Sequence, residues 1–132
     1  MPGLDPTLDR RHMESFAARW AAAWNRRDVE AVLAHFRDDI VFTSPTALAV
    51  AGAATIHGKP ALRDYWNAAL AAIGTLHFTV DHVLWDPSRR ELAIVYDSRI
   101  DGRDRRVSEN MTFDEGGLVA AAEVFHGVTG IG

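Results

Sequence analysis

The chain has 132 residues, of which 48% are hydrophobic, and a formal net charge of −4. This size allows one globular domain with a core that needs no disulfide, and the absence of cysteine excludes disulfides, zinc fingers and thiol nucleophiles. The modest acidic excess argues against nucleic-acid binding, which needs clustered basic charge.

The first third of the chain is predicted to be helical. Apolar residues between Met13 and Trp24 recur at the i, i+3, i+4, i+7 spacing of an amphipathic helix. Asp28 suits the N-cap of a second, shorter helix whose apolar positions run from Val29 to Phe36.

A β-rich run follows at residues 40–44 and ends at Pro45. The segment 46–57 is predicted to be a loop or an irregular strand. A third helix then starts at 58–60, where proline fits the first helical turn because its missing N–H would be unpaired there. Its apolar stripe extends to Ile73, and Gly74 is expected to end it.

The second half of the chain predicts four strands, at 75–85, 91–100, 105–113 and 118–126. The pair Asp101-Gly102 predicts a two-residue hairpin turn. Helices followed by strands favour an α+β fold over a parallel α/β fold. Because no repeat or linker is visible, residues 1–132 are expected to form one domain with flexible ends at about 1–7 and 128–132.

Four short motifs occur in a characteristic order before the strand meander. They are Trp24-Asn25-Arg26-Arg27-Asp28, Phe36-Arg37-Asp38-Asp39, Val41-Phe42-Thr43-Ser44-Pro45 and His57-Gly58-Lys59-Pro60-Ala61-Leu62-Arg63. Together they resemble the NTF2-like superfamily, and within it the SnoaL-like and ketosteroid-isomerase-like branch. The resemblance implies a cone-shaped fold, in which a bent antiparallel sheet with three helices from the N-terminal half over its concave face encloses a pocket. It specifies fold far better than function, because this fold hosts many activities.

Side-chain alternation along the strands predicts which residues face the pocket. In 91–100 the more apolar set contains Tyr96 and Ser98, and in 105–113 one set contains Glu109 and Met111. For 118–126 the composition is ambiguous, and the family pattern favours as inward the set that contains Glu123 and Phe125. For 75–85 the favoured inward set is Leu76, Phe78, Val80, His82 and Leu84.

Two carboxylates on predicted inward faces, Glu109 and Glu123, are the sharpest chemical feature. A carboxylate on an apolar face is costly unless it is paired, hydrogen-bonded or protonated, and burial raises its pKa towards values that suit a general acid or base. Tyr96 and His57 are predicted to assist, which completes the expected catalytic set. The alternative is that either carboxylate reaches water, pairs with a cation, or is turned outward by a one-residue bulge.

Aromatic and small polar side chains are expected to line the cavity and bind the ligand. The predicted set is Trp20, Phe42, Ser44, Tyr65, Trp66, Ser98, Met111 and Phe125. The alternative is that the aromatic residues among them form ordinary core, because aromatic side chains dominate core burial generally.

The resemblance also bears on particular chemistries. The carboxylate base, tyrosine and acid of ketosteroid isomerases correspond here to Ser44, Trp20 and Glu109, and only Glu109 keeps its chemistry, so a working steroid isomerase of that design is not expected. Arg99, Asp101 and Glu123 follow the order of limonene-epoxide-hydrolase-like sites, but Asp101 fits a hairpin turn better.

The expected function is therefore that of a pocket protein for a hydrophobic small molecule. It would be a cofactor-independent isomerase, cyclase or dehydratase that works by general acid–base chemistry. The alternatives are a non-catalytic ligand-binding domain or a dimeric protein-interaction module with the same fold.

Few other partners are indicated by the sequence. No histidine pair has the spacing of a helical metal site, and no Gly-x-Gly-x-x-Gly or P-loop motif occurs, so neither a metal nor a cofactor is expected. The longest apolar stretch, 46–56, is too short to cross a bilayer, and no signal-peptide pattern is visible, so a cytoplasmic protein without membrane contacts is expected. The weakly charged outer face of the sheet favours a homodimer, as the resemblance implies.

Overall fold

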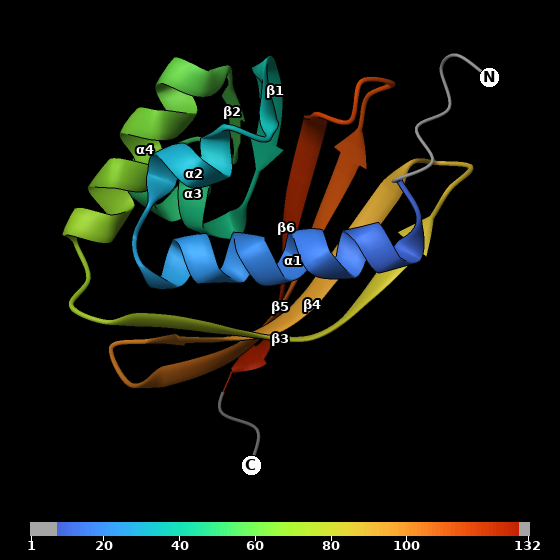
Figure 1. The fold of residues 1–132 in the computed structure, drawn as a ribbon. Helices are drawn as coiled ribbons and strands as arrows, with labels where there is room; N and C mark the ends of the chain where they lie inside the picture. The colour runs from blue at the N-terminus through green and yellow to red at the C-terminus, as the bar shows by residue number, and fades with distance from the viewer. Residues whose placement is uncertain (1–7, 130–132) are drawn as a thin grey trace.

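A computed structural model describes residues 8–129 of the chain. Its elements in order are α1 (Arg10–Asn25), α2 (Val29–Leu33), β1 (Phe36–Thr43), α3 (Pro45–Ala51), β2 (Thr55–His57), α4 (Lys59–Ala71), β3 (Leu76–Asp86), β4 (Glu91–Ile100), β5 (Arg103–Phe113) and β6 (Val119–Thr129). The fold is α+β, as predicted: a curved six-stranded sheet carries the helices, with α1 lying in front of the strands (Figure 1).

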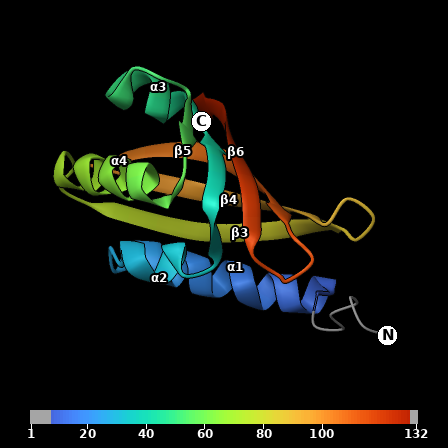
Figure 2. The same cartoon turned by 90° about the horizontal axis from the view of Figure 1, so that it is seen from above.

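The six strands form one sheet in the order β2-β1-β6-β5-β4-β3. All neighbours are antiparallel except β1 and β6, which run parallel, so the sheet is mixed rather than purely antiparallel. Its curvature is strong: in Figure 2, β3 and β4 run across the view whereas β1 and β6 run down it. The curved sheet therefore has a concave face that α1 and the other helices partly cover.

The predicted two-residue hairpin between β4 and β5 is confirmed. Asp101 and Gly102 both have positive φ, 51° and 80°, as the primed hairpin turns require. The Asp101 carboxylate also accepts hydrogen bonds from the backbone N–H groups of Gly74 and Thr75, both at 2.8 Å. This turn is thus held against the start of β3.

The expected flexible segments, 1–7 and most of 128–132, lie outside the described residues. Positions 128 and 129 are an exception, because they are the last residues of β6.

The segment 46–57 was predicted to be a loop or an irregular strand, and this prediction is wrong. The segment contains the helix α3 and the short strand β2. The Ser44 side chain caps α3 by accepting a hydrogen bond from the Thr46 N–H at 3.2 Å, and Pro45 occupies the first turn. Gly52 ends the helix at a φ of 78°. The alanine-rich sequence between these signals has no apolar stripe, which is why periodicity did not reveal a helix.

The motif at residues 24–28 joins three elements. The Asn25 side chain donates to the Phe78 carbonyl at 3.0 Å and accepts from the Phe78 N–H at 2.7 Å, which fixes the end of α1 to β3. Arg27 donates to the backbone carbonyls of Leu70, in the last turn of α4, and of Gly74, just after that helix. Asp28 caps α2, as predicted, by accepting from the Ala31 N–H at 3.1 Å.

Two one-residue irregularities decide which side chains reach the concave face. On β6, Val119 pairs with Phe113 but Ala121 pairs with Thr112, so Ala120 is an extra residue in the strand. The alternation shifts by one, and Val124 and not Glu123 is buried. The prediction that Glu123 and Phe125 point inward is therefore wrong, and Phe125 is 48% exposed.

A similar irregularity occurs on β3. Val80 pairs with Tyr96 but His82 pairs with Val95, which makes Asp81 the extra residue. Beyond it, Val83 is buried against the core, whereas His82 and Leu84 are exposed. The predicted inward set holds for Leu76, Phe78 and Val80 and is wrong for His82 and Leu84.

Burial on β4 and β5 follows the predicted alternation. Leu92, Ile94 and Tyr96 are buried on β4, and Glu109 and Met111 are buried on β5. Among residues 8–129 no helix is long and apolar enough to cross a membrane.

Candidate functional site

An apolar cavity of about 240 Å³ lies on the concave side of the sheet. Its walls come from β3, β4, β5 and β6, from the ends of α1 and β1, and from α3 and α4. Most of the lining atoms are apolar. The polar or titratable side chains among them are Ser44, Thr46, Tyr65, Tyr96, Ser98, Glu109 and His126, with the indole groups of Trp24 and Trp66.

Aromatic rings form much of the cavity wall. Trp66 on α4 packs edge-on against Trp24 and Phe42, with ring centroids 4.8 and 5.4 Å apart. Phe78 and Tyr96 on neighbouring strands lie 4.8 Å apart. Contacts of this kind hold the rings in place, so the cavity has a defined, largely apolar wall.

Glu109 carries the carboxyl group that is buried in the cavity wall. Its side chain is only 5% exposed, and its Oε2 atom has no hydrogen-bond partner among residues 8–129. Burial raises the pKa of the Glu109 carboxyl from 4.5 to about 8. At neutral pH this group is therefore mostly an uncharged carboxylic acid, which can donate a hydrogen bond or a proton.

Tyr65 and Tyr96 add hydroxyl groups to the same cavity. Burial raises the pKa of Tyr65 to about 12, opposed by a hydrogen bond with Ser44 and reinforced by the charge of Glu109. Burial and the charge of Glu109 also raise the pKa of Tyr96 well above its ordinary value. Both phenols keep their protons at neutral pH and can act as hydrogen-bond donors.

The register of the sheet places three polar side chains around one residue. Val107 on β5 pairs with Tyr96 on β4 and with His126 on β6, and Glu109 is the next residue of β5 on the same face. Tyr96 and His126 are thus diagonal neighbours of Glu109, at the separation of about 7 Å that long side chains span. The geometry gathers an acid, a phenol and an imidazole on one wall.

Several predicted site residues do line this cavity. They are Phe42, Ser44, Tyr65, Trp66, Tyr96, Ser98 and Glu109. They come from β1, α4, β4 and β5 and from the α3 cap, elements that the tertiary fold brings together. Their roles in binding or catalysis stay predictions.

The other predicted site residues lie elsewhere. Trp20 packs behind the wall, with its ring centroid 5.7 Å from that of Phe78, and Met111 is fully buried in the core. His57 is exposed on β2 and does not line the cavity. Glu123 and Phe125 are on the outer side of the sheet, as the Ala120 irregularity requires.

His126 is a titratable cavity residue that the strand pattern assigned to the wrong face, together with its neighbour Val124. The irregularity that turns Phe125 outward also turns His126 towards the cavity. The Nδ1 atom of His126 lies 2.6 Å from an Nη1 atom of Arg105. No periodicity argument could have found it, because a bulge changes the alternation without changing the composition.

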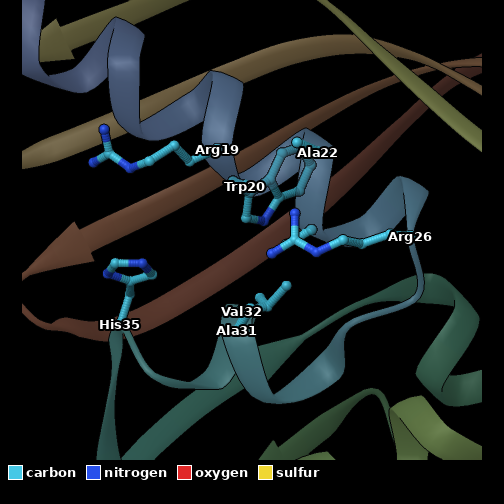
Figure 3. Close-up of a pocket in the computed structure, with 8 residues that line it drawn as sticks. Arg19, Trp20, Ala22, Arg26, Ala31, Val32 and His35 are labelled. Carbon is cyan, nitrogen blue, oxygen red and sulfur yellow. The ribbon is translucent and has the colours of Figure 1, made fainter.

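A second concavity lies between α1 and α2 and opens on the surface (Figure 3). Arg19 and Arg26 extend from α1 along it, and Trp20 and His35 form part of its lining. Burial and the charge of Arg19 lower the pKa of His35. The groove contains no carboxyl group, so the cavity with Glu109 is the better candidate for acid–base chemistry.

Within residues 8–129, no group of three or more His, Asp or Glu side chains is arranged to hold a metal ion.

The strongly curved sheet, with helices over its concave face and an apolar cavity between them, is the NTF2-like fold. The sequence profile of the SnoaL-like domain matches residues 17–126, so the chain belongs to the SnoaL-like family. No curated protein matches this sequence.

Solved structures with this fold include proteins of different kinds. A SnoaL-like protein of unknown function from Burkholderia thailandensis is 28% identical over 92% of this chain and 98% of its own, with a TM-score of 0.82. The epoxide hydrolase/cyclase-like enzyme SalBIII, of pyran ring formation in the polyether salinomycin, is 17% identical over 92% and 95%, with a TM-score of 0.72. The pinacolase BvnE from Penicillium brevicompactum is 18% identical over 93% and 87%, with a TM-score of 0.73. The likeness to the last two is one of fold alone.

Proposed function

We propose that this protein is an acid–base catalyst that isomerises, cyclises or dehydrates a hydrophobic small molecule, with Glu109 as the group that transfers the proton. The observation that carries the proposal is a buried, unpaired carboxyl group on the wall of an apolar cavity. Burying an ionisable group without a partner is costly for the folded protein, and sites that do so are candidates for function.

A carboxyl group that is protonated at neutral pH starts the reaction as a general acid. In a dehydration, Glu109 gives its proton to the leaving hydroxyl, the C–O bond breaks, and water departs. The resulting carboxylate then takes a proton from the adjacent carbon as the C=C bond forms, which restores the acid. One carboxyl group with a pKa near neutrality can serve both halves, because the two transfers are sequential.

The relatives make this class of reaction plausible for the fold. SalBIII is an epoxide hydrolase/cyclase-like enzyme of pyran ring formation and BvnE is a pinacolase, so the proteins with this fold include enzymes. In this chain the aromatic wall would hold an apolar skeleton, while Tyr65, Tyr96 and Ser98 supply donors for its oxygen atoms.

A non-catalytic binding protein is the second candidate. It is favoured by the absence of any Asp, Lys or second Glu among the residues that line the cavity. Ser44, which resembles the base position of ketosteroid isomerases, has its hydroxyl engaged at the start of α3. Such a cavity could hold a ligand without converting it.

The two candidates are separated by Glu109→Gln, which keeps the shape and removes the transferable proton. Native mass spectrometry of the purified protein would first identify a retained ligand and provide the assay. We expect Glu109→Gln to bind that ligand within a few fold of the wild type and to lower kcat by about 10²–10⁴. Glu123→Gln, on the outer side, is the matched control and should keep kcat. An unchanged kcat in Glu109→Gln would remove Glu109 from the chemistry, whereas a wild type that leaves the retained ligand unconverted would favour the binding protein.

A homodimer through the outer face of the sheet also remains a proposal. Phe125 and Leu84 are 48% and 58% exposed on the side away from the cavity, and small or uncharged side chains at Thr112 and Ala121 lie close to Phe125. Burying such a surface between two copies would be favourable. We also propose a cytoplasmic location, because a chain without cysteine is compatible with a reducing compartment.

A further inference from the structure

His126 lies on the same cavity wall as Glu109, although the two residues are 17 positions apart in the chain. The register explains this: Glu109 pairs with Val124 and Val107 pairs with His126, so the imidazole and the carboxyl group are diagonal neighbours on β5 and β6. At about 7 Å between such positions, both side chains can contact one ligand atom placed between them.

Arg105 determines which nitrogen of His126 carries the proton. A guanidinium group only donates hydrogen bonds, so Nδ1 of His126, 2.6 Å from Nη1 of Arg105, must act as the acceptor. The proton of the neutral ring is then on Nε2. The two nitrogens of an imidazole point in different directions, so a ring that directs Nδ1 to Arg105 directs Nε2–H away from it.

Burial and the neighbouring guanidinium group keep the His126 ring neutral. Burial lowers the pKa of His126, and the charge of Arg105 lowers it further. The other titratable groups that share its cavity are Glu109 on β5, Tyr96 on β4 and Tyr65 on α4. With Glu109 and both phenols protonated at neutral pH, the cavity wall presents an uncharged set of hydrogen-bond donors.

We infer that His126 is a second catalytic residue, which donates a hydrogen bond through Nε2–H to the ligand oxygen that Glu109 addresses, and that Arg105 is a positioning residue that fixes this tautomer. The inference rests on the function proposed above, and it specifies a ligand with an oxygen atom that accepts a hydrogen bond from each of the two residues. The oxygen of a carbonyl group, like that of a leaving hydroxyl group, has two lone pairs and accepts from both groups. Both bonds strengthen as negative charge develops on that oxygen during the reaction.

The tautomer is tested on the protein without ligand. Nitrogen-15 NMR at pH 7, with the His126 signals assigned by their loss in His126→Phe, should show a neutral ring with the proton on Nε2. Arg105→Met should turn this single form into a mixture of tautomers. A ring protonated on Nδ1 in the wild type, or a doubly protonated ring, would overturn the inference whatever the ligand is.

The donor role is tested with a pair of probes of equal size, 2-acetylnaphthalene and 2-isopropylnaphthalene, which differ in a carbonyl oxygen. We expect the wild type to prefer the ketone and His126→Phe to lose about 3–10-fold of that preference, the worth of one hydrogen bond. His126→Gln, whose amide can donate, should recover part of it. His57→Phe, on the exposed strand β2, is the control and should behave as the wild type.

The outcomes distinguish this inference from the proposed function. A preference that His126→Phe retains in full would overturn the role of His126 and leave that of Glu109 intact. Failure of the wild type to bind either probe would overturn both, since the cavity would then not accept an apolar ring system. Unfolding temperatures of the variants confirm that each comparison is made on folded protein.

Discussion

Glu123 on β6 pairs with Asn110 and not with Glu109, so the two carboxyl groups lie on opposite faces of the same sheet. One is buried in the cavity wall and the other is exposed on the outer side. The pair provides a built-in comparison, because the same residue type occupies adjacent strands in two different environments. Differences between matched substitutions at 109 and 123 therefore report the effect of burial.

The pH dependence of stability should change in Glu109→Gln. The pKa of Glu109 in the folded protein is about 8 and its ordinary value is 4.5, so the folded state holds the proton more tightly than the unfolded state. The stability due to this group is complete below about pH 4.5 and is lost as the pH rises through 8. The difference between these pKa values corresponds to a loss of about 3–5 kcal/mol at high pH.

Urea unfolding between pH 4 and pH 9 measures this effect. In Glu109→Gln, the free energy of unfolding should lack the decrease that the Glu109 carboxyl group causes as the pH rises. The variant should therefore be more stable than the wild type at pH 9. Glu123→Gln is the matched control and should follow the wild-type profile. Parallel profiles for the wild type and Glu109→Gln would mean that the carboxyl group is solvated in solution.

Filling the cavity from α4 should block ligand binding. Ala69 lines the cavity, whereas its neighbour Ala68 is exposed on the same helix. A ring at Ala69→Phe would occupy ligand space, and we expect the affinity for 2-acetylnaphthalene to fall at least about tenfold, or 1.4 kcal/mol. Ala68→Phe adds the same ring outside and should bind normally. Equal affinities, measured by calorimetry, would place the ligand elsewhere.

The Asn25 contact with β3 should be a major contributor to stability. Asn25→Ala removes two hydrogen bonds to the backbone of Phe78 and leaves a partly buried N–H and C=O unpaired. We expect the free energy of unfolding to fall by about 1–3 kcal/mol. Asn67→Ala, at an exposed position of α4, should change it by less than about 0.5 kcal/mol. Denaturant titration gives both values, and similar losses would contradict the special role of Asn25.

The outer face of the sheet should govern the oligomeric state. If two copies bury Phe125, the wild type should sediment as a dimer, and Phe125→Arg should sediment as a monomer, because it would bring two unpaired charges into the interface. Phe125→Leu keeps an apolar side chain and should remain dimeric. A wild type that is monomeric at all concentrations in analytical ultracentrifugation rules the dimer out.

Much of the fold follows from local physics that the sequence carries openly. The apolar stripe between Met13 and Trp24, the Asp28 cap, and the Asp101-Gly102 turn each depend on a few neighbouring residues, and each is where the pattern predicts it. The inward position of Glu109 also follows, because β5 alternates without interruption from Val107 to Phe113. The acid of the candidate site was therefore predictable from its own strand.

Two features were decided by the tertiary structure alone. They are which residues of β6 face the cavity, and which side chains lie near Glu109. Ala120 is an extra residue in β6 and shifts the alternation of its side chains by one. This shift depends on the pairing of β6 with β5 and on its parallel pairing with β1, and both are interactions between segments that are distant in the sequence. Because of this one residue, Glu123 lies on the outer face of the sheet, whereas His126 lines the cavity and contacts Arg105. Composition is the same for both phases of a strand, so only the packing of one strand on its neighbours could choose between them.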